Sequence, residues 1–204
     1  MKKKNISIID YGVGNHASVE QMMKSLGHRC SVSKVHQELS SSDVIILPGV
    51  GAFPAAMAKL QDDGTVNFLR DLADKGKIII GLCLGMQLLA DKSLEYGDTP
   101  GLGLIPGVVR PLKHVGWHIG WNTLEINHQN ISLKLNADAV VYFNHSYYFD
   151  TSDVYSSVKV TVNDKSFTAG VRKGNVCGLQ FHPEKSQIAG KLFFTQLLDG
   201  LGDA

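Results

Sequence analysis

One apolar stretch that runs directly into a cysteine between two glycines constrains this chain more than any other feature. Residues 77–82 read KIIIGL, and residues 81–90 read GLCLGMQLLA. A short, fully apolar run of this kind is typical of a strand buried on both faces inside a parallel sheet. The pattern from Leu84 to Ala90 predicts a helix. We therefore expect a central strand, a sharp turn at Cys83, and a helix directly after it.

The first half of the chain repeats this alternation of strand and helix. The predicted strands cover residues 5–10, 30–35, 44–47 and 77–82, and the predicted helices cover residues 18–26, 55–73 and 84–90. Alternation of this kind predicts an α/β fold with a mostly parallel central sheet flanked by helices on both faces.

The second half changes character between about Gly107 and Val176. The patterns VVRPL, GWNTLEI, AVVYFNHSYYF, SSVKVTV, FTAGVRKG and NVCGLQF read as short strands. They predict an antiparallel extension of the sheet, followed by a closing helix over residues 187–198. Because the chain contains no internal repeat and no long linker, we expect a single domain over residues 1–204.

Charge and composition exclude several classes of protein. The chain has 20 Lys+Arg against 19 Asp+Glu, a formal net charge of +1, which favours neither nucleic acid nor an anionic membrane as a partner. The apolar run from Ile6 to Ile9 is broken by Ser7, so it is too short for a signal peptide. Three widely spaced cysteines make no disulfide framework, and the histidines show no metal-ligand spacing. We expect a soluble, cytoplasmic protein without metal or cofactor.

Cys83 has the surroundings of a nucleophile. A G-x-C-x-G turn between strand and helix follows the logic of the nucleophile elbow, in which glycines allow the sharp turn. The helix N-terminus favours a thiolate, and the N–H of Leu84 becomes a candidate oxyanion donor. The alternative is a buried, inert cysteine, which the flanking glycines disfavour.

The candidate base lies in the segment GLQFHPEKS. A thiolate nucleophile uses a histidine as acid and base, and the histidine uses a carboxylate that orients it. His182 and Glu184 are two residues apart, so an extended segment points both side chains to one side. The same alternation places Cys177 on the opposite face, and Cys30 has no base nearby.

A glycine-rich loop follows the strand at 44–47, in the segment LPGVGAF. The backbone of Gly49, Val50 and Gly51 carries little side chain, so its N–H groups can point at a developing oxyanion. An ordinary glycine turn is the alternative. A phosphate-binding loop is disfavoured because no G-x-x-x-x-G-K-[ST] pattern follows.

Together these elements resemble the class I, triad-type glutamine amidotransferases, and within that family the glutaminase subunits of imidazole glycerol phosphate synthases. The resemblance covers nearly the whole chain in the family's order and is carried by IIDYGVGNHASV, LPGVGAF, GLCLGMQLL, GLGLIPGVV, HIGWN, NHSYYF and GLQFHPEKS. It implies the family's three-layer α/β fold. It also implies hydrolysis of glutamine by Cys83, His182 and Glu184.

The resemblance also implies a glutamine pocket and a partner. The residues that match the pocket are Gly51, Gln87, His145, Ser146 and Tyr147. The partner is a cyclase subunit with a (β/α)8 barrel, which receives the ammonia within a heterodimer and makes imidazole glycerol phosphate and an aminoimidazole nucleotide. The residues that match the docking surface are Asn15, Trp121 and Asn122. The glycine loop at 49–51 leaves room for an inactive backbone orientation that the partner corrects.

One departure from the family pattern keeps a second hypothesis open. Trp117 stands where family members usually carry a proline, just before HIGWN. A changed docking surface fits a paralogue that feeds a different synthase, such as one that aminates sugars for surface polysaccharides. Two further alternatives remain. One is a non-catalytic subunit, disfavoured by the intact Cys83, His182 and Glu184. The other is a cysteine peptidase or other hydrolase, disfavoured because the loop 49–51 with a pocket at Gln87 favours a small amide.

Overall fold

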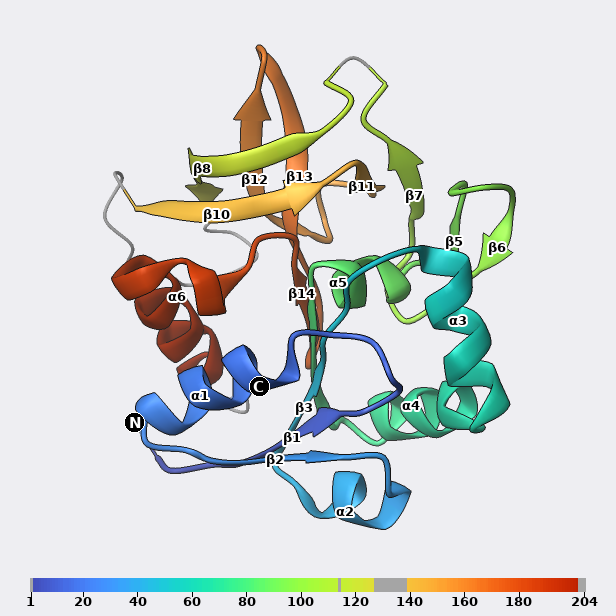
Figure 1. The fold of residues 1–204 in the computed structure, drawn as a ribbon, viewed down its shortest axis with the longest axis vertical. Coiled ribbons are helices and arrows are strands. Elements are labelled where there is room, and N and C mark those ends of the chain that lie inside the picture. Colours follow the sequence, from blue (N-terminus) through green and yellow to red (C-terminus); the bar gives the residue numbers. More distant parts are fainter. Residues whose placement is uncertain (1, 114, 127–138, 202–204) are drawn as a thin grey trace.

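The computed structural model describes residues 2–113, 115–126 and 139–201. Its main sheet has the strand order β2-β1-β3-β4-β14-β13-β12-β9 (Figure 1). These strands are β2 (Arg29–Ser33), β1 (Asn5–Ile9), β3 (Val44–Leu47), β4 (Ile78–Leu82), β14 (Val176–Leu179), β13 (Lys165–Lys173), β12 (Ser156–Val162) and β9 (Glu125–Ile126). The first five strands are parallel to one another. Each of the last three pairs antiparallel with the strand before it in this order. The predicted α/β fold with an antiparallel extension is confirmed.

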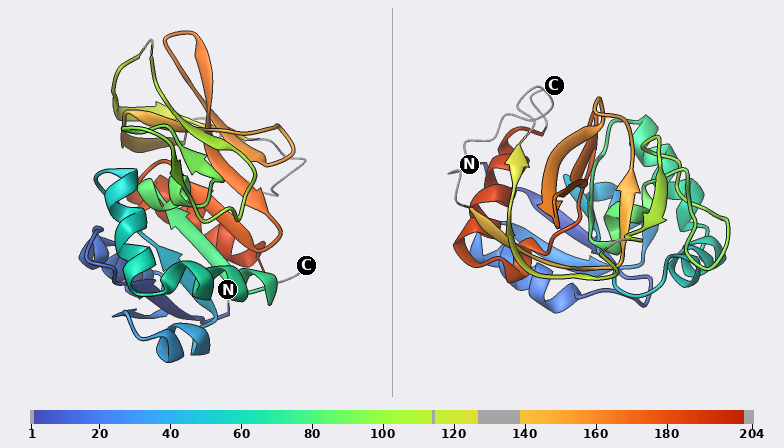
Figure 2. Two further views of the ribbon diagram at one scale, coloured as in Figure 1. Left: turned by 90° about the vertical axis from the view of Figure 1, so that its right-hand side faces the viewer. Right: turned by 90° about the horizontal axis from the view of Figure 1, so that it is seen from above.

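Two smaller sheets complete the second half. One pairs β8 (His118–Thr123) with β10 (Val140–His145), and the other has the order β11-β7-β5-β6. The strands of the second small sheet are β11 (Tyr147–Asp150), β7 (Val108–Pro111), β5 (Lys92–Ser93) and β6 (Thr99–Pro100). Figure 2 shows most of these yellow, green and orange strands gathered at the end of the molecule opposite the blue β2.

Helices cover both faces of the main sheet, because its central strands alternate their apolar side chains between two cores. Ile78 and Ile80 of β4 belong to one core, which α1 (His16–Ser25) and α6 (Gln187–Asp199) cover. Ile79 belongs to the other core. The helices that contribute to this second core are α2 (His36–Ser41), α3 (Phe53–Asp62), α4 (Thr65–Asp74) and α5 (Leu84–Leu88).

Several predicted boundaries were wrong. The single helix predicted over 55–73 is two helices, because Gly64 takes a left-handed φ of +67° between α3 and α4. The run 139–149 divides at Ser146 into two strands that belong to different small sheets. The short α2, β5 and β6 were not predicted, since they have too few residues to show a period. Residues 114 and 127–138 of the predicted strand region lie outside the described residues.

The loops that follow the parallel strands lead to one edge of the sheet. Gly49 comes after β3, Cys83 after β4 and His182 shortly after β14, three strands that are direct neighbours in that order. In an open α/β sheet, ligands bind outside the carboxyl ends of the strands. The fold therefore brings together segments that lie more than a hundred residues apart, such as those of Gly49 and His182.

Candidate active site

Cys83 occupies the sharp turn between β4 and α5. Its φ of 53° and ψ of −109° lie in a region that non-glycine residues rarely adopt. The two flanking glycines are sterically required: a Cβ on Gly81 would lie 2.4 Å from the carbonyl oxygen of Gly85, and one on Gly85 would lie 1.8 Å from that of Leu47. The predicted junction is confirmed, and it is tight because the start of α5 passes directly over the end of β3.

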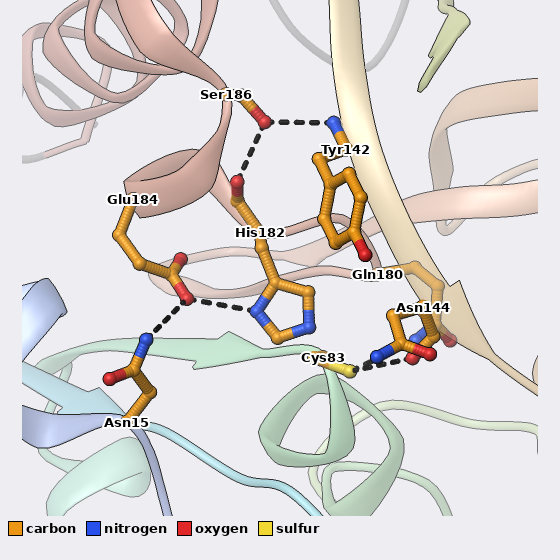
Figure 3. Close-up of polar contacts among 8 residues, drawn as sticks. All are labelled: Asn15, Cys83, Tyr142, Asn144, Gln180, His182, Glu184 and Ser186. Atoms are coloured by element: carbon orange, nitrogen blue, oxygen red, sulfur yellow. Dashed lines mark hydrogen bonds and ion pairs between the residues drawn. The ribbon is translucent and has the colours of Figure 1, made fainter. Parts of the chain in front are cut away.

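His182 lies between Cys83 and Glu184 (Figure 3). Its Nδ1 is 2.9 Å from Oε1 of Glu184, and both side chains are almost fully buried. Burial alone lowers the pKa of His182, but hydrogen bonds to Cys83 and Glu184, and their negative charges, outweigh it and raise the pKa to about 10. The arrangement favours an imidazolium beside the sulfur.

The reason for this contact differs from the predicted one. Only His182 is extended, whereas Glu184 lies in η1, a 3-10 turn over Pro183–Lys185. The backbone of His182 is held from both sides: its N–H donates to the carbonyl of Tyr142, and its carbonyl accepts a 2.6 Å hydrogen bond from the Ser186 hydroxyl. The same hydroxyl oxygen accepts the N–H of Tyr142, so β10 and η1 together fix the imidazole.

The sulfur contacts two polar groups that the sequence analysis did not single out. The Sγ of Cys83 is 3.9 Å from the carbonyl oxygen of Asn144 and 3.8 Å from Nε2 of Gln180 (Figure 3). Gln180 stands two residues before His182. The alternation argument that was applied to Glu184 therefore also predicts that the Gln180 side chain lies on the same side of the segment as His182. Asn144 had no local signal, because it comes from β10, some sixty residues away in the chain.

A cavity of about 450 Å³ opens over the sulfur. It is lined by Val50, Gly51, Cys83, Leu84, Gln87, Glu95, Tyr96, Trp117, Asn144, His145, Ser146, Tyr147, His182 and Lys185. Most of the residues predicted for an oxyanion site or a glutamine pocket are among them. Gly49 is not: it packs against the elbow, where an added Cβ would lie 2.8 Å from the backbone nitrogen of Gly85.

Gln87 and His145 form the polar floor of this cavity. Nε2 of Gln87 donates to the carbonyl of Tyr147 at 3.0 Å and to the side-chain oxygen of Gln180 at 2.9 Å. The ring of His145 bridges the same Tyr147 carbonyl, at 2.8 Å, and Nδ1 of His118, at 3.0 Å. Burial lowers the pKa of His145 to about 4, so this ring is neutral and serves as a fixed hydrogen-bonding group.

Glu95 is the most informative lining residue that sequence reasoning missed. Its side chain is buried, and its Oε2 accepts the N–H of Phe53 at 2.8 Å, at the start of α3. Burial raises its pKa. The next residue, Tyr96, is strained at a φ of 55°. A buried carboxylate at the end of a small pocket is suited to bind a cationic group of a ligand, but neither residue stands in a motif that marks it.

The three residues predicted for a partner surface lie in different settings. Trp121 is half-exposed, and its ring packs edge-on against Tyr142 at 5.8 Å. Asn122 donates its side-chain amide to the carbonyl of Thr161 at 3.0 Å. Asn15 turns inward instead, and its Nδ2 lies 3.5 Å from Oε1 of Glu184, so this loop contacts the pair formed by His182 and Glu184.

The other two cysteines are poorly placed for chemistry. Cys177 is buried in the core, which raises its pKa to about 12. Cys30 is half-buried in β2, where burial and the charge of Glu20 raise its pKa to about 11. Thiolates are the reactive form of cysteine, so neither Cys30 nor Cys177 is a good candidate for the nucleophile. Across the described ranges, no helix is both long and apolar enough to cross a membrane.

Comparison with known proteins identifies the family. A family model described as "Glutamine amidotransferase class-I" matches residues 7–198. The chain belongs to the class I glutamine amidotransferase family.

Within the family, the curated relatives indicate a more specific group of proteins. The chain is 46% identical over 191 residues to the imidazole glycerol phosphate synthase subunit HisH of Bacillus cereus (strain B4264), covering 91% of this chain and 90% of that protein. It is 41% identical over 188 residues to the protein of the same name from Streptococcus gordonii, covering 90% of each.

Solved structures support the fold. PurLQS from Thermotoga maritima aligns with a TM-score of 0.76 at 21% identity, covering 97% of this chain and 99% of that one. The glutaminase domain of Trypanosoma brucei CTPS with bound acivicin aligns with a TM-score of 0.64 at 16% identity, covering 98% and 95%. At these identities the likeness shows the shared fold alone.

Proposed function

We propose that this chain is the glutaminase subunit of an imidazole glycerol phosphate synthase, acting in histidine biosynthesis. It hydrolyses glutamine to glutamate and ammonia, and a cyclase subunit uses the ammonia to make imidazole glycerol phosphate and aminoimidazole carboxamide ribotide. The observation that carries the proposal is the buried His182, with Glu184 at 2.9 Å on one side and Cys83 on the other. It stands beside 46% identity to a named subunit of that synthase.

The reaction uses the three side chains in turn. The Cys83 thiolate attacks the side-chain carboxamide carbon of glutamine; a C–S bond forms and the C=O electron pair moves onto oxygen. The tetrahedral adduct collapses, and its nitrogen leaves as ammonia after taking the proton of His182. His182 then accepts a proton from water, whose oxygen attacks the thioester. The C–S bond breaks, releasing glutamate and the Cys83 thiolate, while Glu184 keeps the imidazole oriented.

The pocket offers a group for each end of glutamine. Glutamine carries an α-ammonium, and Glu95 is the buried carboxylate that lines the same cavity as Cys83. We assign the ammonium to Glu95, and we assign the backbone and side-chain polar groups of His145, Ser146 and Tyr147 to the rest of the amino-acid end. Gln87 supports this wall by holding the Tyr147 carbonyl.

The oxyanion site is assigned to the backbone N–H groups of Leu84 and of the 49–51 loop. Leu84, Val50 and Gly51 line the cavity beside the sulfur, and Gly51 has a φ of +95°, where a glycine turns at no steric cost. One oxyanion donor is worth roughly 10²–10³ in kcat. A loop that is correctly turned only in the complex therefore couples glutamine hydrolysis to the partner.

The partner is assigned as a cyclase subunit with a (β/α)8 barrel, forming a heterodimer with this chain. An exposed apolar strip supports a docking surface beside the site: Trp117, Ile119 and Trp121 are 62%, 61% and 49% exposed. Aromatic side chains are enriched at the centres of protein interfaces. Docking there places the partner next to the cavity in which ammonia is released.

Steady-state glutamine hydrolysis tests the proposal. The chain is assayed alone and with the cyclase subunit and its nucleotide ligand, beside the Cys83→Ala variant. We expect stimulation on the order of 10²–10³, lost in the variant. No stimulation, but alkylation of Cys83 by a glutamine-analogue affinity label, assigns the chain to another synthase, such as a sugar-aminating one. No turnover and no labelling contradicts the glutaminase assignment.

A further inference from the structure

Trp117 lies at the surface of the molecule and also lines the cavity over the catalytic cysteine. It directly precedes β8, and its ring is 62% exposed although it lines the cavity over Cys83. The next residue, His118, is buried and bonded to His145 on the floor of that cavity. Of these two consecutive residues, Trp117 lines the cavity and His118 supports the lining residue His145 from behind.

The indole is held by a specific hydrogen bond. Nε1 of Trp117 donates to Oδ1 of Asn144 at 2.9 Å, while the backbone carbonyl of Asn144 lies 3.9 Å from the sulfur of Cys83. Asn144 thus contacts both the indole and the nucleophile. The hydrogen bond from Trp117 restrains the rotamer of the Asn144 side chain. It thereby restrains the part of β10 whose backbone contacts the sulfur.

The loop that carries Trp117 is tied to the same wall of the pocket. The N–H of Leu112 donates to the carbonyl of Ser146 at 2.9 Å, and the N–H of Gly116 donates to the carbonyl of Leu112 at 2.7 Å. Gly116 has a φ of +73°, and the N–H of Trp117 donates to Val115 at 2.9 Å. This turn fixes the backbone from which the indole reaches the pocket rim.

We propose that Trp117 is a positioning and access-determining residue of this site, a role that rests on the proposed glutaminase function. Its ring forms the outer wall of the cavity and admits small, slender amides to Cys83 while excluding bulky ones. Its N–H orders Asn144 against the sulfur. The two contributions are separable, because phenylalanine keeps a ring at the rim and lacks the donor.

Two variants and a matched control test the proposal. Trp117→Phe removes the hydrogen bond and keeps an aromatic wall, and Trp117→Ala removes both. Leu192→Ala is the control, since Leu192 of α6 is 52% exposed, does not line the cavity and lies outside the exposed strip assigned to the partner. Alkylation of Cys83 is followed by mass spectrometry with a small reagent, iodoacetamide, and a bulky one, fluorescein maleimide. Glutamine turnover is measured at saturating partner, because Trp117 also belongs to the exposed strip assigned to docking.

The expected results separate the wall from the hydrogen bond. Trp117→Ala raises the ratio of bulky to small labelling by about tenfold or more, whereas Trp117→Phe and Leu192→Ala leave the ratio unchanged. Trp117→Phe lowers kcat/KM for glutamine by about fivefold, the size of one neutral hydrogen bond. A labelling ratio in Trp117→Ala equal to that of Leu192→Ala overturns the proposal. Because labelling needs no glutamine hydrolysis, this result is distinct from failure of the proposed function.

Discussion

Oε1 of Glu184 lies 2.9 Å from Nδ1 of His182, and the two side chains are 2% and 6% exposed. A carboxylate this deeply buried needs a cationic or hydrogen-bonding partner. The imidazole supplies it, and Asn15 adds a longer contact at 3.5 Å. The pair formed by His182 and Glu184 is therefore part of what holds the loop after β14 in place.

Glu184→Gln is expected to cut glutamine turnover by roughly 10³–10⁴-fold, measured with the partner, because an amide no longer fixes the tautomer and charge of His182. Binding of the partner should be unchanged, which titration of the two subunits checks. A variant that keeps more than a tenth of wild-type turnover contradicts the role assigned to Glu184.

The same pair makes stability depend on pH. The pKa of His182 is raised from 6.5 to about 10 in the folded protein. A raised pKa contributes stability that is fully present below about 6.5 and is lost as pH rises toward 10. Glu184→Gln removes one cause of the raised pKa. The free energy of unfolding of this variant should therefore fall less than that of the wild-type protein between pH 6.5 and 10. Urea unfolding at pH 6, 8 and 10 checks this, and parallel pH profiles for the two proteins contradict it.

Glu95→Gln is expected to raise KM for glutamine by roughly 10–100-fold, the range of a hydrogen bond to a charged group. Glutaramate, which has the carboxamide but no α-amino group, serves as the matched substrate. Its kcat/KM should be almost the same in both proteins, since it has no ammonium to lose. An equal loss for glutamine and glutaramate assigns Glu95 to structure alone.

Gly85→Ala is expected to prevent the elbow from closing, because the added Cβ lies 1.8 Å from the carbonyl oxygen of Leu47. We expect a loss of about 3 kcal/mol or more in the free energy of unfolding, or no soluble protein. Gly200→Ala is the control, since its Cβ has only an ordinary contact at 3.5 Å. Equal thermal stability of the two variants contradicts the steric argument.

Tyr11→Phe tests the support of the oxyanion loop. The Tyr11 hydroxyl donates to the carbonyl of Pro48 at 2.6 Å in a buried setting, and burial with the nearby Cys83 charge raises the pKa of Tyr11. Losing this bond should cost about 1–2 kcal/mol in the free energy of unfolding and slow glutamine turnover with the partner. Tyr155→Phe is a matched control, since Tyr155 also packs on this core. Unchanged stability in Tyr11→Phe argues against the restraint.

The sequence predicted those features of this protein that short sequence patterns encode. The apolar run before Cys83 identified a central strand, and the glycines at 81 and 85 identified a turn that only a residue without Cβ allows on either side. The segment from His182 to Glu184 named the base and its carboxylate, although it lies in a 3-10 turn. These features are local, because chain connectivity holds their atoms within a few residues of each other.

Tertiary structure alone decided which distant side chains meet at the sulfur. Glu95 follows a two-residue strand, Asn144 is the next-to-last residue of β10 and Trp117 precedes β8, and no local pattern links any of them to Cys83. The parallel order of β3, β4 and β14 brings their carboxyl ends to one edge, and the small sheets then fold over that edge. The sequence by itself determined the reactive groups and the strands that carry them. The pocket around them came from packing between segments whose separation along the chain leaves no periodic signal.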